Sequence, residues 1–250
     1  MNTPETLEIA CSRAWPPLVE EPLGNWRLRW AGGFTGRANS VLAVGDAGRP
    51  VAEALRAVCD FAHDRGIAPM AQVVRDSPNE RAIAAAGWVE AKGHRRGHEV
   101  VVLTAPLVTA PPVPGVVVHD RPTPGWWELT LAAGEDTPAA RRVLTGGTVG
   151  YGVATLDGGT AGVVRGALVD GWLHVGRLEV DPAFRRRGLA SALMNTLHTW
   201  GAEQGARRAV LEVAEANSGA LALYAGLGYA PHHRYRYWVP APGSCEDSTS

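Results

Sequence analysis

Residues 178–190, LEVDPAFRRRGLA, decide the fold of this chain. They predict a strand that ends near Val180, a short loop with arginines at positions 185–187, and a helix that begins at Gly188. The first N–H groups of a helix have no partner within it, and the helix dipole adds positive potential there. Gly188 would let a phosphate group come close to the backbone. The segment therefore predicts an anion-binding turn, with an ordinary basic strand-to-helix turn as the alternative.

The residues around this turn predict a mixed α+β fold. Apolar alternation bounded by the turn signals LDGG and VDG is typical of an antiparallel meander, and apolar side chains at helical spacing are typical of the helices that follow. Asn217 suits the N-cap of the second helix, and Gly228 suits its end. We expect a meander and then β-α-β-α-β, with strands at residues 148–155, 161–168, 172–180, 208–214 and 232–239 and helices at residues 188–203 and 217–225.

Two motifs within these elements resemble those of the GNAT N-acetyltransferase superfamily. Arg185-x-x-Gly188-x-Ala190 matches the pattern Arg/Gln-x-x-Gly-x-Gly/Ala. Residues 211–229, LEVAEANSGALALYAGLGY, resemble the second stretch of that superfamily, L-x-V-x-x-x-N-x-x-A-x-x-L-Y-x-x-x-G-F/Y. Two motifs in the right order and spacing are far more specific than either alone. The chain is therefore identified as a member of this superfamily, which implies the GNAT fold, a mixed central sheet flanked by helices, and acetyl-CoA as co-substrate.

The resemblance also implies which residues bind acetyl-CoA. The main chain of Leu178 and Val180 would bind the acetyl and pantetheine part, where two central strands splay apart and leave backbone groups unpaired. The loop at residues 185–190 would bind the pyrophosphate. The complete expected set is Leu178, Glu179, Val180, Arg185, Arg186, Arg187, Gly188, Leu189, Ala190, Asn217 and Tyr224.

Tyr224 is the expected general acid. Acetyl transfer to an amine needs a neutral nucleophile, a stabilised oxyanion and a proton for the leaving thiolate. By the resemblance, Tyr224 is the tyrosine that protonates the sulfur of CoA. Asn217, Leu221 and Tyr224 recur at i, i+4 and i+7 and therefore share one face of the expected helix. The alternative for Tyr224 is a core aromatic residue whose hydroxyl is satisfied.

Glu212 is the first candidate for the general base. In the expected strand at residues 208–214 it shares a face with Val210, and a carboxylate in a central strand is costly unless it is paired or functional. Its spacing to Asn217 and Tyr224 is similar to that of the ribosomal-protein N-terminal alanine acetyltransferases. In those enzymes the glutamate serves as the base, directly or through water.

His174 and water alone are the other candidates for the base. Strict alternation puts His174 on the same strand face as Leu178 and Val180, where a histidine could accept a proton. A lone strand histidine is more often structural, so this candidate stays open. The same alternation turns Glu179 to the opposite face, where an ion pair is the simpler interpretation.

The resemblance implies that the first helices of the catalytic part, within residues 125–144, supply the acceptor pocket. An aromatic wall with a carboxylate would suit an amine. Buried tryptophans and a solvated acidic face are the alternative. The residues concerned are Trp126, Trp127, Glu128, Glu135 and Asp136.

The amino-terminal part repeats some of this plan. Residues 25–42 predict a β-hairpin that turns at Gly32 and Gly33, with Arg37 and Asn39 favoured as caps of the hairpin over contacts with an acceptor. No pyrophosphate loop opens its first helix, and no tyrosine stands in the place of Tyr224. The helices are expected at residues 51–66 and 78–86 and the strands at residues 69–74 and 98–103.

A proline-rich stretch, APLVTAPPVPG at residues 105–115, separates the two parts. We expect a tandem of two GNAT-like lobes, similar to two-lobed bacterial members of the superfamily. Residues 1–108 would form a degenerate lobe and residues 109–115 a linker. Residues 116–239 would form the catalytic domain, and residues 240–250 a flexible tail.

Composition excludes several classes of protein. With 24 Lys+Arg, 25 Asp+Glu and a net charge of -1, the chain lacks the basic field of a general nucleic-acid or anionic-membrane binder. It shows neither a secretory signal nor an apolar run long enough to span a bilayer. Cys11, Cys59 and Cys245 are odd in number and unpatterned, which excludes a disulfide framework and favours the cytoplasm. No metal is expected, because His232 and His233 would point to opposite faces of a strand. The cysteines have no neighbouring histidine in a recognisable nucleophile pattern.

The expected activity is acetyl-CoA-dependent N-acetyl transfer, made directly to a primary amine. The acceptor would be a small amine, an amino acid or a peptide N-terminus, and the protein a monomer or homodimer without nucleic-acid or membrane partners. A pseudoenzyme that senses CoA and regulates a partner is the alternative. The expected acid and candidate bases favour the enzyme.

Overall fold

The computed structural model describes residues 3–94 and 97–245. Each element expected at residues 148–239 is present, with ends within two residues of those expected. The strands are β1 (Val19–Leu23), β2 (Trp26–Trp30), β3 (Val41–Ala43), β4 (Ala71–Val74), β5 (Trp88–Glu90), β6 (Glu99–Pro106), β7 (Val116–His119), β8 (Thr148–Leu156), β9 (Gly159–Val169), β10 (Trp172–Val180), β11 (Arg208–Ala214) and β12 (Ala230–Pro240). The helices are α1 (Pro4–Ala14), α2 (Val51–Asp64), α3 (Pro78–Ala85), α4 (Pro124–Thr130), α5 (Pro138–Thr145), the 3-10 turn η1 (Pro182–Phe184), α6 (Leu189–Glu203) and α7 (Ser218–Gly226).

Helices α1, α3, α4 and α5 begin in the same way. Each has a Thr or Ser N-cap whose hydroxyl accepts the N–H of the third helical residue, followed by a proline that has no N–H to satisfy. These N-caps are Thr3, Ser77, Thr123 and Thr137. In the described part of the chain, no helix has the length and apolar character needed to cross a bilayer.

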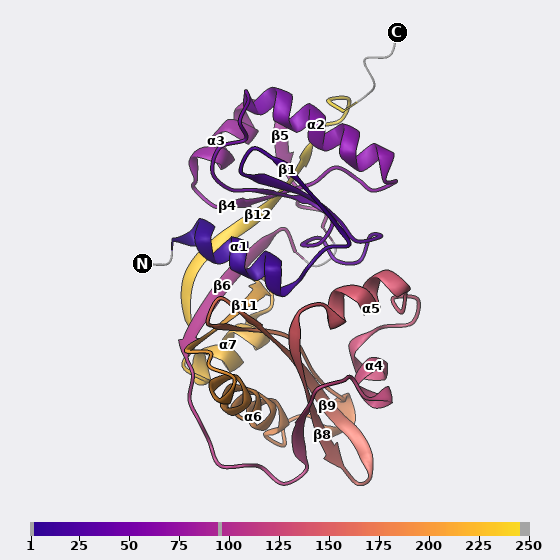
Figure 1. Cartoon of the computed structure of the whole chain (residues 1–250), viewed down its shortest axis with the longest axis vertical. Helices are drawn as coiled ribbons and strands as arrows, with labels where there is room; N and C mark the ends of the chain where they lie inside the picture. Colours follow the sequence, from indigo (N-terminus) through magenta and orange to yellow (C-terminus); the bar gives the residue numbers. More distant parts are fainter. Residues whose placement is uncertain (1–2, 95–96, 246–250) are drawn as a thin grey trace.

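One mixed sheet runs through the described structure in the order β1-β2-β3-β4-β12-β6-β11-β10-β9-β8-β7, and β5 pairs with β12. The two halves exchange strands near its middle. Strand β6 of the amino half lies between β11 and β12, and β12 from the end of the chain lies between β4 and β6. Figure 1 shows β6 and β12 running between the end of the molecule that carries α2 and α3 and the end that carries α6 and α7. The sheet is thus continuous across the expected lobe boundary, and the division into lobes stays a prediction.

Helix α1 packs where the halves meet. Its Leu7 and Cys11 are buried in one cluster with Trp172 of β10, Val210 of β11 and Tyr235 of β12. Burial of side chains of this size stabilises a fold by about 1.5–3 kcal/mol each. The helix was not among the expected elements, and it joins strands of both halves at the centre of the sheet.

Strands β10 and β11 pair in parallel along only part of their length. Their register runs from Trp172↔Arg208 to Val175↔Leu211 and stops there. A bulge in β10 between Gly176 and Glu179, with Arg177 at φ +53°, shifts its register against β9. The second half of β10 is therefore separated from β11, as the family resemblance implies.

The bulge also corrects the expected alternation along β10. Leu178 and Glu179 both line the cavity described below, whereas His174 is fully buried elsewhere. Glu179 therefore faces the cavity and is not on the opposite side of the strand. His174 is enclosed and does not line the cavity beside Leu178. An extra residue in a strand exchanges the two faces beyond it, which strict alternation does not anticipate.

A second bulge corrects the expectation for the two adjacent histidines. In β12 the register against β6 shifts between Pro231 and His233. The rings of His232 and His233 lie 5.0 Å apart, and their Nδ1 atoms form a hydrogen bond of 2.8 Å. The side chains therefore meet instead of pointing to opposite faces.

The odd and unpatterned cysteines excluded a disulfide framework, but the structure contains one disulfide. Cys59 of α2 and Cys245 form a disulfide across 186 positions of sequence. A turn after β12, in which the N–H of Ser244 donates to the carbonyl of Ala241 at 3.0 Å, brings the tail back to α2. This pairing removes the argument for a reducing compartment, and residues 246–250 of the expected flexible tail lie outside the described residues.

The expected hairpin at residues 25–42 is a looser structure. Strand β2 pairs along its length with β1 and meets β3 only at Arg27↔Leu42. Between β2 and β3, Asn39 holds a long loop. Its Oδ1 accepts the N–H groups of Ala31 and Gly33, and its Nδ2 donates to the carbonyls of residues 34 and 35. Asn39 therefore organises the loop, as favoured from the sequence.

Candidate active site

A cavity of about 1150 Å³ opens where β10 and β11 separate. One side consists of the ends of β10 and β11 and of α7. The other side consists of the loop at residues 35–37, His94, the end of α4 and its following loop, and two tyrosines of β12. Both halves of the chain therefore build the cavity, and its size is that of a small-molecule site.

The turn before α6 has the geometry of an anion site. Gly188 is the N-cap with φ +77° and no side-chain cap, and the N–H of Ala192 donates to its carbonyl at 3.0 Å. The N–H groups of residues 189–191 therefore have no partner within the helix and lie at its positive end. A Cβ on Gly188 would meet nothing within 4 Å, so the left-handed backbone, and not crowding, favours glycine here.

Three exposed arginines, at residues 185–187, surround this turn. The Nε of Arg185 donates to the carbonyl of Val180 at 3.2 Å, and the guanidinium of Arg187 lies 5.5 Å from the ring centre of Phe184. Their charge and the open N–H groups fit a pyrophosphate. The assignment of this turn to CoA stays a prediction.

Helix α7 presents the expected acid to the cavity. Asn217, Ala220 and Tyr224 line it, and Asn217 also caps the helix by accepting the N–H of Ala220 at 3.1 Å. Burial, together with the negative charge of Glu179, raises the pKa of Tyr224 to about 12. A phenol with this pKa keeps its proton at neutral pH, which suits a proton donor.

Glu212 lies at the inner end of the cavity and is held from two sides. Its side chain is 2% exposed, and its Oε2 accepts hydrogen bonds from Arg37 and, at 2.8 Å, from the Nε2 of His174. Burial alone would raise the pKa of Glu212. The charge of Arg37 and the contacts with His174 outweigh that effect and bring the pKa to about 2. The carboxylate is therefore ionised and engaged.

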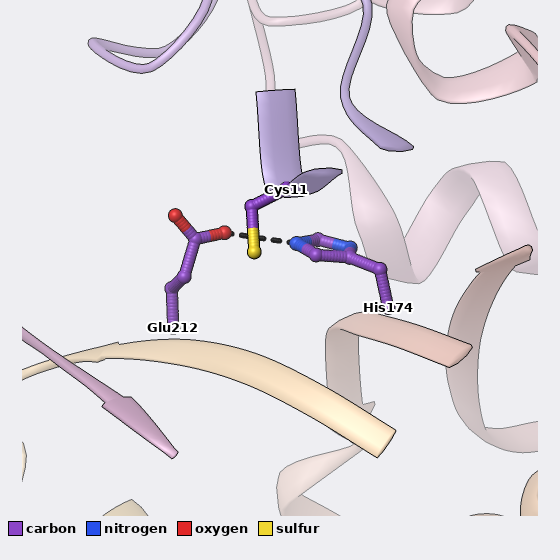
Figure 2. A group of neighbouring side chains, drawn as sticks. All are labelled: Cys11, His174 and Glu212. Carbon is purple, nitrogen blue, oxygen red and sulfur yellow. Dashed lines mark hydrogen bonds and ion pairs between the residues drawn. The ribbon is translucent and has the colours of Figure 1, made fainter. Parts of the chain in front are cut away.

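Cys11, His174 and Glu212 form one buried cluster beneath the cavity. Figure 2 shows Cys11 of α1 beside the hydrogen bond between the other two side chains. Their possible ligand atoms lie within 4.8 Å of one another, so the fold brings a histidine to Cys11 that no sequence pattern marks. Burial lowers the pKa of His174, against the effect of Glu212, and raises that of the Cys11 thiol well above its usual range.

This cluster does not fit a metal ion well. The Nε2 of His174 and the Oε2 of Glu212 already bond each other, and Arg37 brings a positive charge to the same carboxylate. A protonated, buried thiol is also a poor ligand, since the thiolate is the form that binds metals. The arrangement instead pairs one oxygen of a buried carboxylate, Oε2, with Arg37 and His174.

Arg37 crosses from the amino half to reach that carboxylate. Its guanidinium also lies 4.6 Å from the ring centre of Trp15, which follows α1. The loop that carries it includes Thr35 and Gly36, and all three residues line the cavity. The interpretation of Arg37 as a cap of the hairpin is therefore wrong, whereas the same interpretation of Asn39 is confirmed.

His94 and two tyrosines of β12 also line the cavity, and the sequence analysis missed them. The ring of His94 lies 4.9 Å from that of Tyr237, and its Nδ1 is 2.9 Å from the carbonyl oxygen of Gly97. Tyr235 and Tyr237 contact each other at 5.5 Å between ring centres. No local motif marks these residues, because strand exchange is what brings β12 beside the amino half.

The expected aromatic wall between residues 125 and 144 is mostly absent from the cavity. Trp126 is fully buried and its Nε1 donates to the carbonyl of Val164 at 3.2 Å, while Trp127 packs under Arg141. Asp136 forms an ion pair with the same arginine, Arg141. The expected carboxylates Glu128 and Glu135 do line the cavity, so the acidic part of this expectation agrees with the structure.

The chain matches the protein family described as probable histone acetyltransferase Rv0428c C-terminal over residues 5–238. Among solved structures, a GCN5-related N-acetyltransferase from Kribbella flavida has a TM-score of 0.71 at 16% identity, with 97% of each chain covered. A tandem GNAT protein from the clavulanic acid biosynthesis pathway has a TM-score of 0.62 at 18% identity, covering 95% of this chain and 88% of that one. At these identities, the two structures show that this chain shares their fold.

Two curated relatives match parts of the chain. Acetyl transferase GW6a of Oryza sativa subsp. japonica is 40% identical over 58 residues, which are 23% of this chain and 14% of the relative. The N-terminal acetyltransferase B complex catalytic subunit naa20 of Schizosaccharomyces pombe is 36% identical over 95 residues, 38% of this chain and 53% of the relative. The match thus spans well under two thirds of either relative.

Proposed function

The chain belongs to the family described as probable histone acetyltransferase Rv0428c C-terminal and is a GNAT-type acetyltransferase, and on this premise we propose that it transfers an acetyl group from acetyl-CoA directly to a primary amine. The acceptor is a small amine, an amino acid or a peptide N-terminus. The observation that carries the proposal is the separation of β10 from β11 beside an uncapped helix start, with Tyr224 on the wall of the same cavity.

In this proposal acetyl-CoA lies between the separated strands. The backbone of residues 178–180 binds the acetyl and pantetheine part, because these groups have lost their neighbour in β11. The open N–H groups of residues 189–191 and the arginines at 185–187 bind the pyrophosphate. Asn217 contributes at the rim, where its side chain already caps α7.

Tyr224 supplies the proton that the leaving sulfur needs. As the amine nitrogen bonds to the thioester carbon, the C–S bond breaks and its electron pair stays on sulfur, which takes the phenolic proton. The pKa of about 12 keeps that proton on Tyr224 until the thiolate forms. The nitrogen loses one proton, which reaches solvent, and the phenolate recovers one from solvent. In total one proton has passed from nitrogen to sulfur.

The spacing of Glu212 in the sequence suggested a general base. Its contacts suit a different role, which is to position the loop at residues 35–37. Its Oε2 is held by Arg37 and His174, and with a pKa of about 2 it has little tendency to accept a proton. His174 lies behind it, fully buried. In our proposal the pair of Glu212 and Arg37 fixes the loop at residues 35–37 as a wall of the acceptor site.

The walls of the cavity support an amine acceptor. Glu128 and Glu135 offer negative charge from the α4 side, and Tyr235 and Tyr237 offer aromatic surface from β12. Carboxylates and aromatic rings both attract a cationic amine. The names of the family and of the fission-yeast relative point to protein acceptors, and we include a peptide N-terminus for that reason.

Thiol release from acetyl-CoA tests the proposal. We would assay an aliphatic amine, free amino acids and alanine-initiated peptides, and measure CoA binding by calorimetry. Turnover with any acceptor supports the enzyme. Tight CoA binding without turnover by any of them would favour the CoA-sensing alternative, and absence of CoA binding would refute both.

A further inference from the structure

We propose that His94, from the amino half, is the general base that takes the proton of the acceptor amine. The inference rests on the proposed acetyl transfer and adds a catalytic residue to it. The expected candidates in β10 and β11 are engaged or enclosed, whereas His94 offers an oriented imidazole to the same cavity that Tyr224 lines.

The hydrogen bond to Gly97 fixes the tautomer of His94. Its Nδ1 lies 2.9 Å from the carbonyl oxygen of Gly97, and a carbonyl can only accept, so Nδ1 carries the hydrogen. In the neutral ring the lone pair is then on Nε2. The backbone supports this geometry, because the N–H of His94 donates to the carbonyl of Ala91 at 2.8 Å and the N–H of Gly97 donates to that of His94 at 2.9 Å.

Residue 36 is a glycine beside the Nε2 atom of His94. A Cβ on Gly36 would lie 3.2 Å from that Nε2, 3.2 Å from the Cζ of Tyr237 and 3.1 Å from the Cε of Met70. Gly36 and both rings line the cavity. Tyr237 packs against the imidazole at 4.9 Å between ring centres and holds its plane. The imidazole is thus oriented, and glycine at position 36 keeps any side chain of that residue away from its Nε2 edge.

Three other ionisable groups of the cavity suit other tasks. Glu212 binds Arg37 and His174, and its Oε1 is buried without a hydrogen-bond partner among residues 3–94 and 97–245. Glu179 lies close enough to Tyr224 for its charge to raise the pKa of the acid, which places it on the side of the sulfur. Glu128 is exposed on α4 and can attract a cationic acceptor.

The proton moves as follows. The acceptor nitrogen forms the C–N bond with the thioester carbon and loses a proton to the Nε2 of His94, while the C–S bond breaks and the sulfur takes the proton of Tyr224. The products are the amide and the free thiol of CoA. The imidazolium then returns its proton to solvent and the phenolate recovers one, which leaves both side chains as they began.

Two substitutions of His94 separate a base from a structural group. In His94→Asn, the side-chain N–H₂ can still donate to Gly97, but nothing replaces Nε2. In His94→Gln, an amide oxygen can take the place of Nε2 as a hydrogen-bond acceptor, but it cannot accept a proton. His63→Asn, at the exposed end of α2, is the matched control.

We expect kcat for thiol release to fall about 100-fold or more in both His94 variants, with the KM for acetyl-CoA unchanged and part of the rate restored by added imidazole. His63→Asn should keep the wild-type kcat. The probes are an aliphatic amine, free lysine and an alanine-initiated peptide.

A kcat within about threefold of wild type in either folded His94 variant would overturn the inference. If only His94→Gln kept the wild-type kcat, His94 would act as a hydrogen-bond acceptor for the acceptor amine and not as a base. That result would also overturn the inference. Absence of turnover by the wild-type protein with every probe, despite CoA binding, would instead be a failure of the proposed function itself.

Discussion

Arg37 and Glu212 form a buried ion pair across 175 positions of sequence. The guanidinium comes from a loop of the amino half and the carboxylate from β11, and the two side chains are 21% and 2% exposed. The pair therefore connects the separated strands to the wall opposite them. Its strength affects both the stability of the protein and the shape of the acceptor side of the cavity.

Loss of Arg37 should destabilise the protein strongly. Arg37→Met leaves the Glu212 carboxylate buried without its cation, and breaking such a pair costs about 3–5 kcal/mol. Urea unfolding monitored by fluorescence measures this change. Arg27→Met, which breaks the half-exposed pair with Glu20, should cost no more than about 1 kcal/mol. If the two variants lost the same free energy of unfolding, the pair of Arg37 and Glu212 would contribute no more to stability than an exposed ion pair.

Glu212 should also give stability a distinct dependence on acid. Its folded pKa of about 2 is below the ordinary value of 4.5, so its contribution is complete above pH 4.5 and is lost as the pH falls toward 2. In Glu212→Gln the free energy of unfolding should therefore be lower at neutral pH and fall less steeply between pH 4.5 and 2. Parallel pH curves for the two proteins would contradict this assignment.

Tyr224→Phe should lower kcat by about 100- to 10,000-fold with little change in the KM for acetyl-CoA, because in the proposed reaction the phenol protonates the leaving sulfur. The pKa of about 12 also predicts that titration of Tyr224 causes no loss of kcat below about pH 11. Tyr151→Phe, which removes a buried hydroxyl bonded to Leu144 away from the cavity, is the control and should keep kcat. Equal kcat in both variants would exclude Tyr224 as the acid.

Gly188→Ala should weaken CoA binding at least tenfold, measured by calorimetry. The left-handed backbone at φ +77° costs about 1–2 kcal/mol with alanine, and the new methyl group stands where a phosphate would approach. Gly205, after the other end of α6, has φ +88° and equally open surroundings. Gly205→Ala should therefore lose similar stability and keep the wild-type affinity. Wild-type CoA affinity in Gly188→Ala as well would exclude the turn before α6 from binding.

Cys245→Ser should lower the free energy of unfolding by about 2–4 kcal/mol, because the disulfide closes a long loop in the unfolded chain. Adding dithiothreitol to the wild-type protein should produce the same loss and should leave the variant unaffected. Thiol titration before and after reduction provides the count of free cysteines. Three titratable thiols in the unreduced, denatured protein would show that the pair is not formed.

Local sequence signals were sufficient to predict the elements on the side of the cavity proposed to bind CoA. The arginine-rich turn, Gly188, the cap at Asn217 and the face that carries Tyr224 all depend on residues close together in the chain, and the elements around them follow from periodicity. Helix α1 also had a signal, since Thr3 and Pro4 begin a helix and apolar residues follow at positions 7, 10, 11 and 14.

The acceptor side could not be predicted in this way. The contact of Arg37 with Glu212 and the approach of Tyr237 to His94 depend on which strands become neighbours, and periodicity contains no such information. The bulge at Gly176 was equally hidden, because one extra residue in a strand changes the faces of the residues after it without changing the hydrophobic pattern before it.

The exchange of β6 and β12 also has a consequence for the nascent chain. When β6 leaves the ribosome, neither of its neighbours exists yet, since β11 and β12 are made last. A strand without partners exposes its backbone N–H and C=O groups and is prone to wrong pairing. We therefore expect the amino half to complete its sheet only after synthesis of the carboxyl terminus, so that the whole chain, and not each lobe, is the unit that folds.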